Sequence, residues 1–297
     1  MLFAAPRNVV LAAWGLVCLV AVLSGCSRSP EGSRALIQNK GSDTLVNLAQ
    51  AWAEAYAPIR PEVAVAVSGG GSGTGIAALV NGTVDIANAS RSIKPPEREQ
   101  ITASQEGKKA VEHVVAADAV AFFVHTRNPL KGLTVEQLRC IYAEGGSCDN
   151  WPSVGVVVPG CSGQEIIRVS RQSNSGTYVF VREKVLGEQT DFKLGSRDMQ
   201  GSKDVVELVS KTPCAIGYSG LAYETAGVRT LCVTAEKGAD CIAPGVDSSR
   251  SGSYPLSRPL FMYTLGEPTG PVKSYLEWIR SSDGQAIVRA AGFIPVN

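Results

Sequence analysis

The sequence of 297 residues contains few of the side chains that bind metals or nucleic acids. Two histidines are present, His113 and His125, and none of the eight cysteines lies in a Cys-x-x-Cys pair, so the usual ligand spacing of a zinc site is missing. Lysine and arginine are interspersed with acidic residues, and no positive cluster is available to displace the counterions of a nucleic acid. We therefore expect no metal, no other cofactor and no nucleic-acid partner.

The pattern of a catalytic serine is also missing. The nucleophile elbow of many hydrolases is Gly-x-Ser-x-Gly, but Thr74 stands where the second glycine would follow Ser72. Ser173 likewise stands where the first glycine would precede Ser175. Both histidines lie in or beside apolar strand patterns, which leaves neither serine with a base beside it. We expect these serines to act as hydrogen-bond donors and the protein to be no enzyme.

The first residues form a secretory leader. Arg7 precedes an apolar run, Val9 to Leu23, that is shorter than a confident membrane span. Small residues then lead to Cys26 and resemble the bacterial lipobox, in which the cysteine receives a diacylglyceryl group, the leader is removed and the new amino terminus is acylated. We expect a lipoprotein signal peptide over residues 1–25 and a flexible tether over 26–34. An ordinary cleaved signal or an uncleaved anchor is the alternative.

Lipidation predicts a place outside the cytoplasm. At about 0.8 kcal/mol per buried methylene group, several acyl chains hold a protein stably on a membrane. We expect the mature protein to be exported and lipid-anchored to the cell membrane or outer membrane, facing the periplasm or the exterior. Loss of the leader removes only Arg7 from the charged residues, so the mature chain is close to neutral.

Six cysteines remain once Cys18 of the leader and Cys26 are set aside. An even number in an exported protein predicts disulfides. The short spacing of Cys232 and Cys241 makes them the first choice. The favoured set adds Cys140 with Cys148 and Cys161 with Cys214, and the competing set joins Cys140 or Cys148 to Cys161.

Strand-like and helix-like stretches alternate along the chain, which indicates an α/β architecture with mostly parallel sheets. Leu45 to Tyr56 has the apolar spacing of a helix with one buried face, and Thr134 is expected to cap another helix. Ala119 to His125 and Arg258 to Leu265 are expected to cross between two lobes, residues 35–125 plus 255–297 and residues 126–254. Further strands are expected at 35–39, 63–67, 84–87, 166–170 and 215–218, and further helices at 75–80, 177–186, 205–209, 272–280 and 285–290.

Three clusters of glycine, serine and threonine run directly into apolar-periodic stretches: Gly41 to Thr44, Gly69 to Gly75 and Arg171 to Thr177. A helix start leaves backbone N–H groups without partners and carries a partial positive charge, so anions bind there. One such cluster is ordinary helix capping. Three together, one of them with an arginine, indicate an oxyanion site.

These residues, in this order, resemble the phosphate-binding subunit of bacterial phosphate ABC importers, in its shorter variety. The most specific part is Arg171 to Thr177, an arginine, three residues and Ser-Gly-Thr before a helix. Gly71 to Gly75 with Asp85, Ile86 and Ser90 is similar to a second family stretch, and Asn150, Trp151 and Thr212 to Tyr223 resemble further landmarks.

The resemblance implies a two-lobe periplasmic binding protein of type II, with two crossing strands as its hinge. It implies that a monomer captures inorganic phosphate between the lobes and hands it to the transmembrane subunits of an ABC permease. The implied phosphate-binding residues are Ser42, Thr44, Leu45, Ser72, Gly73, Ser90, Arg91, Arg171, Ser175, Gly176 and Thr177.

The chain departs from the family at one position. Longer members have an aspartate where Ser90 and Arg91 stand here, and that carboxylate accepts a proton from phosphate, which sulfate does not carry. Asp43 and Asp118 are the candidates for this role in the present chain.

Arg91 itself has two interpretations, since it either adds charge to the site or pairs with Glu97 or Glu99 on the surface. The alternatives for the whole protein are a binder of another oxyanion, such as sulfate, molybdate or tungstate, and a phosphate sensor lipoprotein. A phosphatase is the least favoured interpretation.

Overall fold

The computed structural model describes residues 34–236 and 238–296. Residues from Arg34 onwards form one compact unit, so the lobe boundaries at 125/126 and 254/255 stay a prediction. The expected signal peptide, the lipid site at Cys26 and nearly all of the tether lie outside the described residues. Within the described part of the chain, none of the helices has the length and apolar character needed to cross a membrane.

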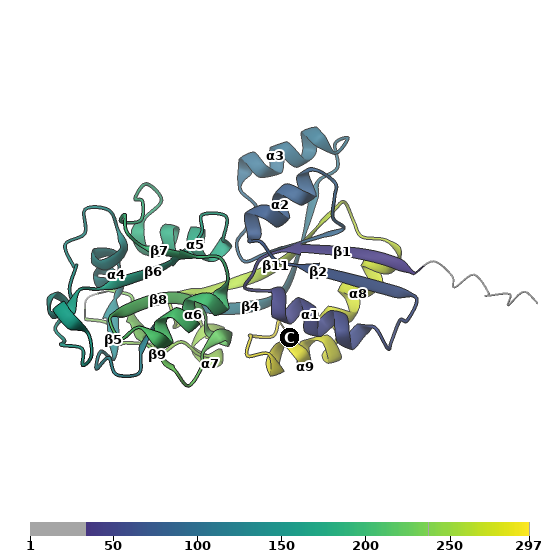
Figure 1. Ribbon diagram of the computed structural model, residues 1–297. Coiled ribbons are helices and arrows are strands. Elements are labelled where there is room, and N and C mark those ends of the chain that lie inside the picture. The colour runs from purple at the N-terminus through teal and green to yellow at the C-terminus, as the bar shows by residue number, and fades with distance from the viewer. Residues whose placement is uncertain (1–33, 237, 297) are drawn as a thin grey trace, which may run out of the picture. The chain divides into compact units, whose positions relative to one another are not determined.

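One mixed sheet of nine strands organises the described chain (Figure 1). Its strands are parallel at the two ends of the sheet and antiparallel in the middle, where β4 and β11 pair. The order is β2 (Val63–Ser68), β1 (Ala35–Gly41), β3 (Ile86–Ala89), β11 (Ser257–Leu265), β4 (Ala110–His125), β8 (Ala215–Gly220), β6 (Ile167–Arg171) and β7 (Arg197–Met199), with β9 (Val228–Thr230) paired to β4. A separate small sheet joins β10 (Cys232–Thr234) to β5 (Gly132–Thr134).

Helices cover the sheet around four hydrophobic clusters, of which the two largest surround Trp52 with Tyr275 and Trp151 with Tyr142. We call the elements around Trp52 and Tyr275 the first half, and those around Trp151 and Tyr142 the second half. The first half holds α1 (Val46–Tyr56), α2 (Ser72–Val80), α3 (Pro95–Ser104), α8 (Gly270–Arg280) and α9 (Ser282–Ala290). The second half holds α4 (Val135–Tyr142), α5 (Gly176–Val181), α6 (Ser202–Lys211) and α7 (Val246–Arg250).

Sequence periodicity explains how α1 is packed. Its buried residues Leu48, Ala49, Trp52 and Tyr56 follow the predicted helical spacing. The Trp52 indole donates to the carbonyl oxygen of Gly284 at 2.8 Å, which satisfies its N–H inside the first core. The packed helix therefore holds the loop before it, Gly41 to Thr44, against the first core.

Strands β4 and β11 connect the two halves. The first part of β4 pairs with β11, and its last residues, Val120 to Val124, pair with β8. Strand β4 therefore passes from the first half into the second near Ala119, and β11 begins beside that point (Figure 1). The sequence predicted crossings at Ala119 to His125 and at Arg258 to Leu265. Asp118 and Arg258 face each other in the register of this pairing.

Several segments differ from the sequence expectations. The short elements β5, β7, β9, β10 and α7 were not predicted, and three longer segments differ as well. Helix α3 was not expected, because Ile101 is its only buried residue and the apolar period is missing. Strand β4 begins at Ala110, whereas the sequence predicted a start at Ala119. The earlier residues were missed because they are half exposed and lack a continuous apolar run. The predicted helix 177–186 divides after Val181 into α5 and a wider π turn, Arg182–Leu186.

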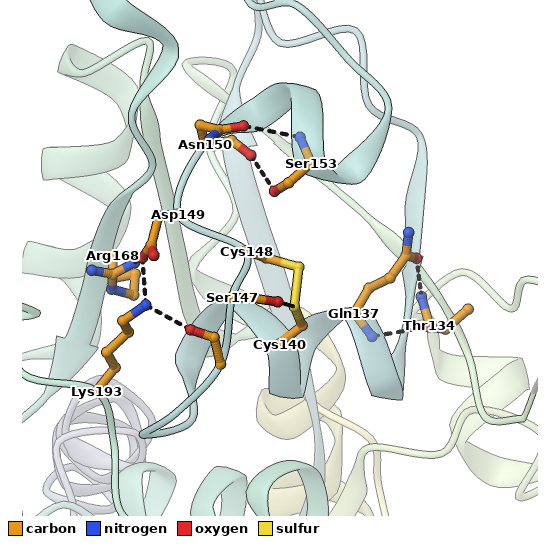
Figure 2. Close-up of a disulfide and its surroundings, with 11 residues drawn as sticks. Thr134, Gln137, Cys140, Ser147, Cys148, Asp149, Asn150, Ser153, Arg168 and Lys193 are labelled. Atoms are coloured by element: carbon orange, nitrogen blue, oxygen red, sulfur yellow. Dashed lines mark hydrogen bonds and ion pairs between the residues drawn. A yellow bond between two sulfur atoms is a disulfide. The ribbon is translucent and has the colours of Figure 1, made fainter.

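All three disulfides belong to the favoured set: Cys140–Cys148, Cys161–Cys214 and Cys232–Cys241. Figure 2 shows the first, which joins the last turn of α4 to the following loop. At the other end of α4, Thr134 Oγ1 accepts from the Gln137 amide at 3.0 Å and Gln137 Oε1 accepts from the Thr134 amide at 2.9 Å, so the predicted cap is a full capping box. Both ends of α4 are thus fixed.

Removing disulfides one at a time should destabilise the protein unequally. The chain-entropy model gives about 4 kcal/mol for Cys161–Cys214, with a sequence separation of 53, and about 2.6 kcal/mol for Cys232–Cys241, with a separation of 9. Urea unfolding of the two double alanine variants, without reductant, measures the difference. Equal losses would contradict the entropic explanation, and six free thiols in the unreduced wild type would contradict the pairing itself.

Candidate anion-binding site

Five buried hydroxyl groups from the three predicted clusters and from the end of β3 come together in the structure. Ser42 Oγ donates to Ser90 Oγ at 3.0 Å, and Ser90 Oγ lies 3.3 Å from Ser72 Oγ. Thr44 Oγ1 and Thr177 Oγ1 form a hydrogen bond of 3.0 Å across 133 residues of sequence. All five residues are at most 2% exposed. The name hydroxyl cluster is used below for these five groups.

The first half holds its part of the hydroxyl cluster by backbone contacts. The Ser42 amide donates to Asn88 O at 2.9 Å, which fixes the Gly41–Thr44 loop against the end of β3. Ser90 N donates to Ser72 Oγ at 3.0 Å, which ties the end of β3 to the first residue of α2. These contacts hold three segments of the first half together without any contribution from the second half.

The second half approaches through Gly176, the first residue of α5. A Cβ atom there would lie 2.4 Å from Ser72 Oγ and 2.5 Å from Ser90 Oγ, so only glycine lets α5 reach the hydroxyl cluster. The Ser175 hydroxyl accepts from the amides of Thr177 and Tyr178 and caps the helix, as Ser residues commonly do. Its oxygen is thus used within α5.

Asn174 joins the rims of the two halves. Its backbone carbonyl accepts from the Gly73 amide at 2.9 Å, and its side-chain amide donates to Gly70 O at 2.8 Å. Gly71 has φ +91°, and a Cβ on it would lie 2.8 Å from the Asn174 carbonyl oxygen. The glycine run before α2 is therefore required for this contact as well as for its own turn.

Arg171 is fully buried, and its donors are directed at the protein. Nε and Nη2 donate to Gln200 O at 3.1 and 2.6 Å, and Nη1 donates to Ser202 Oγ at 2.9 Å. Nη2 also pairs with Asp43 Oδ2 at 3.3 Å, a contact between the second half and the loop before α1. Burial lowers the pKa of Arg171, and the nearby Asp43 carboxylate opposes that shift.

Arg258 is a second buried arginine at the site, and the sequence analysis did not identify it. Its Nη2 donates to Thr177 Oγ1 at 2.9 Å and to Thr44 Oγ1 at 3.4 Å, and its Nη1 donates to Ser90 O at 3.0 Å. Nη2 is also 2.9 Å from Asp118 Oδ2. The available signal was a charged residue at the start of an apolar strand, in a stretch expected only to connect the lobes.

The two candidate carboxylates occupy different surroundings. Burial raises the pKa of Asp118, while Arg258 and the backbone N–H groups of Leu221 and Ala119 lower it. Asp43 is partly exposed, with its Oδ1 accepting from the Gly70 amide at 2.8 Å. Tyr223 donates its hydroxyl to the carbonyl oxygens of Asp43 and Thr44, and burial raises its pKa well above the usual value, so it stays a donor.

Three other residues that were predicted to bind phosphate make contacts within the protein. Arg91 pairs with Glu97 at 2.6 and 2.7 Å, as one of its two interpretations proposed, but its side chain is 8% exposed and so is not on the open surface. The Leu45 amide donates to Ser42 O at 3.0 Å, and the Gly73 amide is used by Asn174. Beside them, Ser90, Arg91 and Arg258 line a cavity of about 440 Å³ together with Phe180 and Lys184 of the second half.

The described residues offer no group of three or more His, Cys, Asp or Glu side chains that could hold a metal ion. What they offer is donors: hydroxyl groups and two arginines, whose charges are balanced by Asp43 and Asp118. Such a site is suited to bind an oxyanion through hydrogen bonds with little net charge of its own.

Several known proteins are similar in sequence to this chain over most of its length. A family model for the PBP superfamily domain matches residues 28–283. The phosphate-binding protein PstS of Pseudomonas aeruginosa is 34% identical over 270 residues, covering 88% of this chain and 83% of that protein, and PstS of Bacillus subtilis is 30% identical over 276 residues, covering 92% and 85%.

Solved structures give the same result. A Clostridium perfringens protein, assigned as a phosphate ABC transporter substrate-binding protein with bound phosphate, has a TM-score of 0.77 and 28% identity, covering 88% of this chain and 100% of that one. An ABC-type phosphate transport receptor from Vibrio cholerae has a TM-score of 0.68 and 26% identity, covering 87% and 99%. The expected α/β fold of the type II periplasmic binding proteins is confirmed, and the chain belongs to the PBP superfamily and, within it, to the family of phosphate-binding proteins PstS.

Proposed function

We propose that this protein binds inorganic phosphate between its two halves and delivers it to an ABC permease. The observation that carries the proposal is the hydroxyl cluster, which both halves supply and which two buried arginines flank. Its relatives are named phosphate-binding proteins, and the Clostridium perfringens neighbour holds phosphate. The family and the chemistry of the cluster therefore support the same ligand.

The physical case rests on the cost of removing water from the anion. A buried polar group costs free energy unless its lost hydrogen bonds are replaced, and the cost is larger for a charge. Ser42, Thr44 and Ser72 lie at the starts of α1 and α2, where the helix dipoles add positive potential. Hydroxyl groups rotate to donate, so they adapt to the oxygens of the ligand.

Release follows from separating the halves. Polar contacts join them at the site, among them Thr44 with Thr177, Asn174 with Gly70 and Gly73, and Arg171 with Asp43. Opening about the β4–β11 crossing removes the donors of one half from the anion and returns it to water. No bond is made or broken, so the protein needs no catalytic group.

The remaining parts of the proposal concern location and partners. A lipid on Cys26 would hold the protein outside the cytoplasm, where it would act as a monomer that docks on the permease. The Pseudomonas aeruginosa relative is named a phosphate-binding protein and the Clostridium perfringens neighbour a phosphate ABC transporter substrate-binding protein, which supports binding without turnover. Sulfate, molybdate or tungstate binding, a sensor role and phosphatase activity are alternatives that the similarities do not favour.

Calorimetric titration of the mature protein without its tether tests the proposed function. The protein is unfolded and refolded first to remove carried-over ligand, then titrated with phosphate, sulfate and molybdate. We expect saturable binding of phosphate and much weaker binding of the others. Preference for another oxyanion, or no binding at all, would reject phosphate capture.

Arg171→Ala should weaken phosphate binding by roughly 10- to 100-fold, the range expected when a hydrogen bond to a charged group is lost. The variant also leaves Asp43 without its partner. Arg168→Ala is the control, because Arg168 lies on the same strand and pairs with Asp149 (Figure 2) instead of with a residue of the hydroxyl cluster. Wild-type affinity in folded Arg171→Ala would remove this arginine from the site.

Cys26→Ser should leave an unlipidated protein that is released from the membrane fraction or keeps its leader, with phosphate binding unchanged. Fractionation, mass spectrometry of the amino terminus and titration of the purified variant measure the three properties. A processed variant that still pellets with membranes would show that the anchor is something other than a lipid on Cys26.

A further inference from the structure

Arg258 and Asp118 form a buried ion pair on the two strands that cross between the halves. The residues are directly opposed in the β4–β11 register, and their side chains are 2% and 1% exposed. Asp118 Oδ2 accepts from both Nη2 and Nε of Arg258, at 2.9 and 3.3 Å. A pair this deep costs desolvation energy, so packing alone gives no reason to place it in the crossing.

The same Nη2 of Arg258, and Nη1 beside it, are directed at residues of the hydroxyl cluster. The guanidinium donates to Thr44 of the first half, to Thr177 of the second half and to the carbonyl oxygen of Ser90. Its Cζ also lies 5.3 Å from the centre of the Phe180 ring on α5. Arg171 differs, because three of its four hydrogen bonds to protein acceptors go to Gln200 and Ser202. Arg258 is therefore the arginine that contacts the hydroxyl cluster directly.

The Asp118 carboxylate is committed to holding that arginine. Both bonds from Arg258 go to its Oδ2, and a Cβ on Gly220 would lie 2.9 Å from its Oδ1, so the carboxylate is closely enclosed. Asp43, the other candidate for the proton acceptor, is partly exposed, and its Oδ2 accepts a hydrogen bond from Arg171 at 3.3 Å.

We propose that Arg258 is a second anion-binding cation of the phosphate site, and that Asp118 is a positioning residue that aims its guanidinium between Thr44 and Thr177. The inference rests on the proposed function and deepens it. The pair is neutral, so it adds a directed donor without adding net charge to the site. Loss of Asp118 thus has opposite effects under two explanations: a positioning role predicts weaker binding, while simple repulsion between Asp118 and the anion predicts tighter binding.

The test compares Arg258→Gln, Arg258→Lys, Asp118→Asn and the double variant Asp118→Asn/Arg258→Gln by titration with phosphate and with sulfate. We expect a roughly 10- to 100-fold loss of phosphate affinity for Arg258→Gln, from the lost charged hydrogen bond. Arg258→Lys should recover part of the loss, since it keeps the charge but has no fork to span two threonines. Asp118→Asn should weaken binding, and the double variant should bind like Arg258→Gln, because Asp118 acts only through Arg258.

Circular dichroism and thermal unfolding of each variant separate binding from folding. Arg168→Gln is the matched control, because it removes an arginine from an ion pair remote from the hydroxyl cluster and should keep the affinity within about twofold. If Arg258→Gln does not fold, Arg258→Lys and Asp118→Asn still decide. Tighter binding by Asp118→Asn, or wild-type affinity in a folded Arg258 variant, would overturn the inference.

The outcome for the wild type keeps the two proposals apart. If the wild type prefers sulfate or molybdate, phosphate capture fails, and the same variants titrated with that anion still test Arg258. If the wild type binds phosphate while the Arg258 variants match it, only the further inference fails. No binding of any oxyanion by the wild type overturns both.

Discussion

The antiparallel pairing of β4 with β11 is the interaction on which the other features depend. It joins the two halves, since β4 continues from its pairing with β11 into its pairing with β8. It also sets Asp118 opposite Arg258, and so aims a buried guanidinium at hydroxyl groups of both halves. A hinge made of two paired strands resists shear but permits bending, which suits a protein whose halves must separate and rejoin in one register.

Charge balance is the second constraint on the site. Two arginines and two aspartates are placed around uncharged donors, and each arginine has its own carboxylate. A lone buried arginine would have a large desolvation cost, and an excess of positive charge would hold the anion too firmly for release. Dipoles from hydroxyl groups and helix starts supply the remaining stabilisation of the anion. They act only at short range, so they lose their effect when the halves part.

Local chemistry made much of this structure predictable. Helix α1, the three glycine and hydroxyl clusters and two of the disulfides depend on residues near one another in sequence, and Cys161–Cys214 followed as the remaining pair. Arg258 was missed because its partners lie 81 to 214 residues away, and no local pattern marks them. Arg91 had two interpretations for a related reason: only its rotamer decides between Glu97 and the site. Helix α3 escaped notice because it buries a single apolar residue.

The arrangement of the cores also determines the order in which the two halves can fold during synthesis. The main core of the second half draws on one continuous stretch, from Ala119 to Leu256. That of the first half needs both Ile37 and Phe293, so it is completed only when almost the whole chain is available. The second half can therefore fold on a growing chain while the first cannot, and a chain cut short near its end keeps one finished half without a partner to close on.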